Sequence, residues 1–100
     1  MTYYSVLDVT PTNDDWIEDY LPTANRLVKK YGGKYLARTS SHEQVEGDKK
    51  EAALRIILEW PSKEAAMNFE RDEEYLPHLT KRLENSTSHH YLIEGKDDLA

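Results

Sequence analysis

Four histidines are the side chains of this sequence best suited to proton transfer or metal binding near neutral pH. His89 and His90 are adjacent, and neighbours in a strand point to opposite faces, so this pair alone forms no two-ligand metal site. His42 lies among acidic residues in a polar stretch that is typical of a solvated loop, and His78 follows a proline in a helical segment. No histidine has the spacing of a zinc-protease motif. The sequence therefore predicts no metal site.

Other reactive motifs are also missing. There is no cysteine, hence no thiolate nucleophile and no disulfide. Nucleophile elbows and adjacent bases are missing around Ser40, Ser41, Ser62, Ser86 and Ser88, and Ser62 is better explained as a helix cap. The chain has no glycine-rich phosphate loop and no dinucleotide fingerprint. We expect the protein to carry no flavin, haem, nicotinamide or stoichiometric transition metal.

The candidate ligand-binding residues are the carboxylate Glu59 and two side chains expected to contact it, Arg38 and His90. In the predicted strand 53–60 the even-numbered residues are all apolar, which places Glu59 on the opposite face, away from the helices and towards a cavity between two sheets. A partly buried carboxylate must be hydrogen-bonded, paired or protonated, so Glu59 is a candidate acid or base. Arg38 and His90 are its expected partners. The alternative is a pair of Glu59 with Arg38 or Arg55 that only satisfies the interior.

The elements that position these residues follow from periodicity and breaker residues. We predict strands over 3–9, 34–39, 53–60 and 89–94, with a further extended stretch over 42–46. Asn13 is the expected cap of a first helix that is kinked or restarted at Pro22 and ends at Gly32. Ser62 caps a second helix, and Asp72 is the candidate cap of a further helical segment carrying Tyr75, Leu76, Leu79 and Leu83.

The order strand, helix, strand, strand, helix, strand predicts a ferredoxin-like α+β fold, with both helices on one face of the sheet. Neither face of strands 3–9 and 53–60 is cleanly polar. The second face therefore needs a cover, and a second copy of the chain is the expected one. The sequence has seven tyrosines and one phenylalanine, which suits either an interface or a ligand pocket.

Length and charge limit the remaining possibilities. One hundred residues form one domain, 1–100, with a core over 3–95 and a frayed tail over 96–100. The net charge of −6, without a basic stripe, argues against nucleic acid as a partner. No apolar run reaches the length of a membrane span and no targeting segment is evident, so we expect a soluble protein of the cytoplasm without a membrane partner.

Five blocks of sequence carry a family resemblance. They are Tyr-Gly-Gly-Lys-Tyr-Leu-Ala-Arg at 31–38, Val-Glu-Gly at 45–47, Leu-Glu-Trp-Pro-Ser-Lys-Glu-Ala-Ala at 58–66, Asp-Glu-Glu-Tyr at 72–75 and Ile-Glu-Gly at 93–95. In this order and spacing, over residues 3 to 95, the chain resembles domain-of-unknown-function family 1330. Trp60 stands where phenylalanine is typical, and Thr39-Ser40-Ser41 replaces a common glycine-rich turn.

The resemblance implies a dimeric α+β barrel, in which two sheets pack face to face, but it implies no established activity. Two functions stay open. The first is a small homodimeric protein with a small-molecule pocket between the sheets and no catalysis. The alternative is a cofactor-independent enzyme, similar to the monooxygenases or isomerases of the wider superfamily, that acts on a small organic acid or a phenolic compound.

Overall fold

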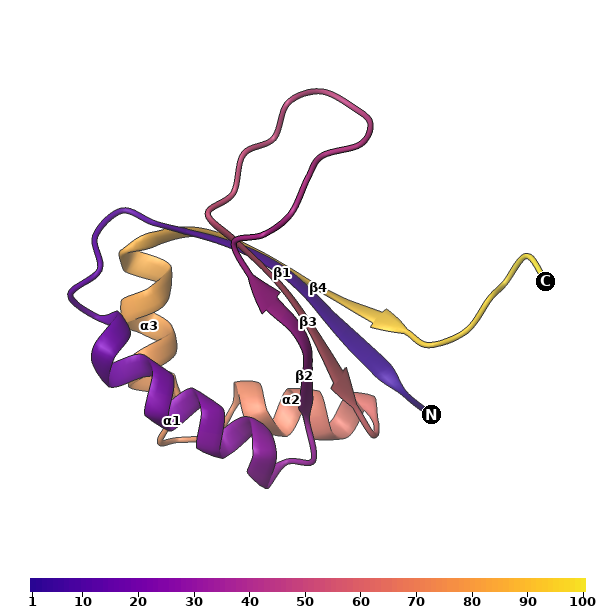
Figure 1. Ribbon diagram of the computed structural model, residues 1–100. Coiled ribbons are helices and arrows are strands. Elements are labelled where there is room, and N and C mark those ends of the chain that lie inside the picture. Colours follow the sequence, from indigo (N-terminus) through magenta and orange to yellow (C-terminus); the bar gives the residue numbers. More distant parts are fainter.

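The chain folds into one four-stranded antiparallel sheet with helices packed on one face, as a computed structural model that describes residues 1–100 shows (Figure 1). The strand order is β2-β3-β1-β4. The strands and helices, in chain order, are β1 (Tyr3–Pro11), α1 (Ile17–Lys30), β2 (Lys34–Thr39), β3 (Leu54–Trp60), α2 (Lys63–Glu70), α3 (Leu76–Glu84) and β4 (Ser86–Glu94). This βαββαβ arrangement confirms the predicted ferredoxin-like α+β fold.

The first helix begins later than predicted. Asn13 does not cap it: α1 begins at Ile17, and the Asn13 side chain instead accepts a hydrogen bond from the backbone of Asp15 at 3.3 Å. The helix also runs through Pro22 without a restart, because its buried face is held against the sheet on the C-terminal side of the proline. Gly32, at φ +78°, ends the helical turn as predicted.

The boundaries of the other elements differ in smaller ways. β1 and β4 are longer than expected, because they pair with each other as far as Pro11 and Ser86. Residues 42–46 form no strand, so that prediction is wrong, and the segment between β2 and β3 projects beyond the sheet as a loop (Figure 1). Ser62 caps α2 as predicted, and its hydroxyl accepts from the backbone of Ala65 at 3.0 Å. Asp72, the candidate cap of the next helical segment, accepts a hydrogen bond from the backbone N–H of Glu74. It does not cap α3, because that helix begins at Leu76 and Tyr75 holds the N-cap position.

The core lies between the sheet and the helices. The even-numbered residues of β3 face the helices as the alternation predicted, and Leu58 and Trp60 are 5% and 1% exposed. They pack with residues of β1, α1, α2 and the turn before α3: Leu7, Ala24, Leu27, Val28, Ala66, Phe69 and Tyr75. The opposite face of the sheet has no cover within the chain and exposes Val6, Ile57, Tyr91 and Ile93. None of the three helices is long and apolar enough to span a membrane.

Candidate functional site

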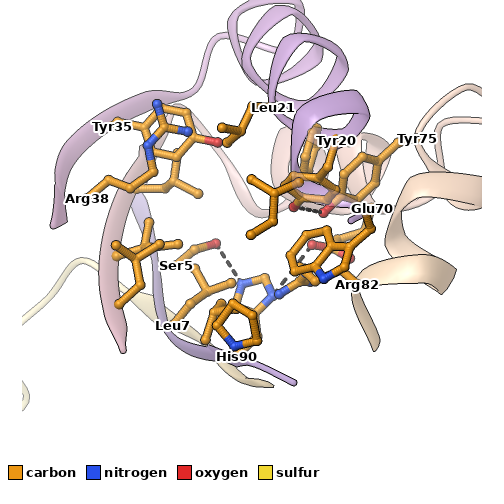
Figure 2. A pocket seen from close by; sticks show the side chains of 18 of the residues that line it. Ser5, Leu7, Tyr20, Leu21, Tyr35, Arg38, Glu70, Tyr75, Arg82 and His90 are labelled. Atoms are coloured by element: carbon orange, nitrogen blue, oxygen red, sulfur yellow. Dashed lines mark hydrogen bonds and ion pairs between the residues drawn. The ribbon is translucent and has the colours of Figure 1, made fainter. Parts of the chain in front are cut away.

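A cavity lies between the sheet and the helices, on the same face as the core (Figure 2). Its volume is about 100 Å³. Most of its walls are apolar side chains of β1, β3 and α1, and aromatic rings from four elements contribute. This is about two-thirds of the volume of an engineered apolar cavity of about 150 Å³ that binds benzene, so a single-ring compound would enter only if some lining side chains shift.

Arg82 is the most unusual residue of the cavity wall. It is 4% exposed, and its Nε has no hydrogen-bond partner in the chain. It also takes part in none of the ion pairs of the structure. A buried guanidinium N–H without an acceptor is costly, because it has lost its hydration and gained no hydrogen bond in return. Arg82 can therefore hold the carboxylate, phenolate or carbonyl oxygen of a bound molecule.

Two tyrosine hydroxyls lie near the same part of the cavity. The hydroxyls of Tyr20 and Tyr75 are hydrogen-bonded to each other at 2.7 Å (Figure 2). Burial raises the pKa of both phenols, so both are neutral at physiological pH. The Arg82 guanidinium carbon lies 5.9 Å from the centre of the Tyr20 ring. These groups offer a bound oxygen a cation and polar hydrogens in an otherwise apolar space.

A second set of polar side chains, from β1, β4 and α2, lies in the cavity wall. Ser5 Oγ lies 2.8 Å from Nε2 of His90, and Nδ1 of His90 lies 3.5 Å from Oε1 of Glu70 (Figure 2). The indole Nε1 of Trp60 donates to the same Ser5 oxygen at 2.8 Å. Since the indole can only donate, the Ser5 hydroxyl accepts from Trp60 and is free to donate its own proton to His90.

The protonation of this group follows from its surroundings. Burial, together with the positive charge of Arg82, lowers the pKa of His90, so the imidazole is neutral near pH 7. Burial raises the pKa of Glu70, and the attraction of Arg82 opposes that shift. The contact between His90 and Glu70 is an ion pair only when the imidazole is protonated. His90 is therefore a free base that is held in place by a buried hydroxyl.

Arg38 lies at the rim of the cavity. Its side chain donates to Oδ1 of Asn25 at 2.6 Å, and its guanidinium carbon lies 3.8 Å from the centre of the Tyr35 ring. Burial raises the pKa of Tyr35, and Arg38 opposes the shift. Arg38 is exposed, whereas Arg82 is buried. It is placed to meet a ligand at the entrance rather than to hold it inside.

The structure brings two of the three predicted ligand-binding residues to one cavity. Arg38 and His90 both line it. Glu59 does not: it is paired in register with Tyr4 and Lys34, on the face of the sheet away from the helices. The expected pair of Glu59 with Arg38 is absent, because side chains on the two faces of a sheet cannot meet.

Sequence reasoning missed Ser5, Glu70 and Arg82. For Arg82 a signal existed, since it follows Tyr75 by seven residues and Leu79 by three, which is the spacing of the inward face. A charged residue on that face is informative because such a residue is rarely buried without a purpose. Leu83 was counted among the apolar positions of this helix instead, but Leu83 is 56% exposed.

Comparison with known proteins gives the family. Residues 2–96 match DUF1330, a domain of unknown function. The chain belongs to this family. A comparison with curated proteins gave no match.

Solved structures with the same fold include a protein of unknown function and two proteins named as oxygenases. A protein of unknown function from Rhodopseudomonas palustris superposes with a TM-score of 0.79 at 15% identity, over 96% of this chain and 83% of that one. A variant of SnoaB, a cofactor-independent oxygenase from Streptomyces nogalater, gives 0.67 at 21% identity, over 98% and 96%. An antibiotic biosynthesis monooxygenase gives 0.52 at 17% identity, over 97% and 100%. At these identities the likeness shows the fold alone.

Proposed function

We propose that this DUF1330 protein binds a small organic acid or phenol in the cavity between sheet and helices, with the acidic oxygen on the guanidinium of Arg82. The observation that carries the proposal is the buried Arg82 side chain, whose Nε is unpartnered and which forms no ion pair. A bound anion would supply the missing charge and acceptor. The apolar walls would take up a ring or a short hydrocarbon body.

The same proposal includes a homodimer. Four large apolar side chains on the uncovered face of the sheet support it: Val6 is 36% exposed, Ile57 40%, Tyr91 66% and Ile93 50%. A second copy that packs its own sheet against this face would bury them together. The ligand site proposed here lies on the other face of the sheet, so each chain would contain a complete cavity.

A second candidate function is a cofactor-independent enzyme. One observation favours it: a neutral imidazole, His90, is hydrogen-bonded to the buried Ser5 hydroxyl in the wall of the cavity. Such a group can remove a proton from a bound molecule without metal or cofactor. The fold shared with a cofactor-independent oxygenase makes this function worth testing, although fold alone does not establish it.

Calorimetric titration with single-ring carboxylates and phenols tests the binding function. We expect saturable binding by the wild-type protein and binding weaker by tenfold to about a hundredfold in Arg82→Met, because a hydrogen bond to a charged group contributes about 1.5–3 kcal/mol. Lys81→Met is the matched control, since Lys81 is the exposed neighbour of Arg82 in α3. Binding that survives unchanged in Arg82→Met would contradict the proposal.

A further inference from the structure

Three side chains from β1, β4 and α2 form a line of contacts in the cavity wall. We propose that Ser5, His90 and Glu70 act together as the proton acceptor for a weakly acidic ligand whose oxygen lies at Arg82. The proposal rests on the proposed function and narrows its ligand class. Such a ligand would be a phenol or an enol, because a carboxylic acid is already ionised at neutral pH and needs no acceptor.

The geometry gives each group a definite part. Ser5 Oγ is 2.8 Å from His90 Nε2, which accepts the hydroxyl proton because Trp60 already donates to Ser5. The neutral imidazole then carries its own hydrogen on Nδ1, which faces the Glu70 carboxyl oxygen at 3.5 Å. The contacts therefore connect the Ser5 hydroxyl, through the His90 imidazole, to the Glu70 carboxyl group (Figure 2).

The transfer is balanced within the site. The O–H bond of the ligand breaks and its proton goes to Ser5 Oγ, while the Ser5 hydroxyl proton moves to Nε2 of His90. Ser5 ends as it began, the ligand becomes an anion beside Arg82, and His90 becomes an imidazolium that faces Glu70. No electron is transferred and no further reactant is required.

Ligand binding and proton transfer would favour each other. The charged groups that face His90 are Arg82 from α3 and Glu70 from α2. The positive charge of Arg82 disfavours the imidazolium in the free protein. A ligand anion on Arg82 would offset that charge, and the Glu70 carboxylate would then pair with the imidazolium. The proton therefore moves more readily when the ligand is in place.

A groove on the outer surface supports the same assignment. His90 and Glu70 also line this groove, together with Ala66, Met67 and Leu92. The side chains of His90 and Glu70 are 26% and 24% exposed. The imidazolium would thus keep some hydration, which lowers the cost of placing a charge there. His90 and Glu70 therefore line both the cavity and this outer groove.

The visible absorbance of 4-nitrophenol tests the proposal, because only the phenolate absorbs strongly there. At a pH below the pKa of the free phenol, we expect wild-type protein to bind it with the phenolate spectrum. His90→Gln should lose the phenolate spectrum while it still binds the neutral phenol. His89→Gln is the matched control, since His89 lies on the opposite face against Asp8 and should leave the spectrum unchanged.

A calorimetric measurement on the wild-type protein alone also tests whether His90 accepts the ligand proton. Titration in two buffers with different heats of ionisation should show no net proton release, because the ligand proton stays on His90. Release of a full proton, a neutral phenol spectrum in the wild type, or a phenolate spectrum retained by His90→Gln would each overturn the proton acceptor and leave the binding function standing. If 4-nitrophenol does not bind the wild-type protein, this proposal fails; if the carboxylates fail to bind as well, the proposed function falls with it.

Discussion

Replacement of Arg82 by methionine should make the ligand-free protein more stable while it weakens binding. Methionine fills a similar volume with an apolar chain and removes a guanidinium that is 4% exposed and has an unpartnered Nε. An unsatisfied buried donor costs about 1–3 kcal/mol, and replacing buried charges by apolar residues is often stabilising by about 1–4 kcal/mol. A residue kept at such a cost is expected at a site that binds a ligand.

Two attractions reduce the expected gain. The guanidinium carbon lies 5.9 Å from the Tyr20 ring centre, a contact of about 0.5–2 kcal/mol, and Arg82 also attracts Glu70. We therefore expect a net increase of about 1 kcal/mol in the free energy of unfolding, or about 4–8 °C in Tm for a domain of this length.

Urea and thermal unfolding of wild type, Arg82→Met and the control Lys81→Met measure this effect. Lys81 is exposed, so its replacement should change the free energy of unfolding by no more than about 0.5 kcal/mol. A loss of more than about 1 kcal/mol in Arg82→Met would show that Arg82 stabilises the ligand-free fold through partners within the chain, and would contradict its assignment to a ligand anion.

Three further changes test the fold, the assembly and one pH dependence. Ile57→Glu should lower the dimer fraction in sedimentation velocity more than Lys63→Glu, because only Ile57 lies on the uncovered sheet face; equal effects would count against that interface. Gly33→Ala should destabilise the protein by about 1–3 kcal/mol in urea unfolding, since its Cβ would lie 2.6 Å from a buried tryptophan ring; a neutral change would show that the core can yield there. The Tyr31 hydroxyl donates to Asp72 at 2.6 Å and lowers the pKa of that carboxyl, so its stabilisation is present above the unfolded pKa and lost as pH falls through the folded one. Tyr31→Phe should therefore be less stable than wild type at neutral pH and equal to it in acid, and a difference that persists in acid would refute this assignment.

The fold could be predicted because its signals are local and repeated. The apolar alternation of β3 indicates which face meets the helices, and Ser62 and Gly32 mark helix ends by their own chemistry. The ends of β1 and β4 could not be predicted, because residues as far as Pro11 and Ser86 are extended only through pairing with each other. Such pairing is a property of the whole sheet and leaves little trace in either segment.

The site was only partly predictable for a related reason. Strand alternation gives faces within one strand, but it does not say whether a ligand lies under the helices or between two sheets. Glu59 was chosen for the second location, and that prediction stays untested within one chain. The cavity inside the single chain lies in the first location and includes Arg38 and His90. Arg82 was hidden because one position along a helix turns a side chain by about a quarter turn, and Leu83 is the more apolar neighbour.

The most direct test of the central claim is a crystal structure of the wild-type protein with bound 4-nitrophenol. Our account predicts the ring inside the cavity between the sheet and the helices, with the phenol oxygen within hydrogen-bond distance of the Arg82 guanidinium and of the Ser5 hydroxyl. A ligand found only on the uncovered face of the sheet, near Glu59, or one that fills the cavity without contacting Arg82, would contradict it.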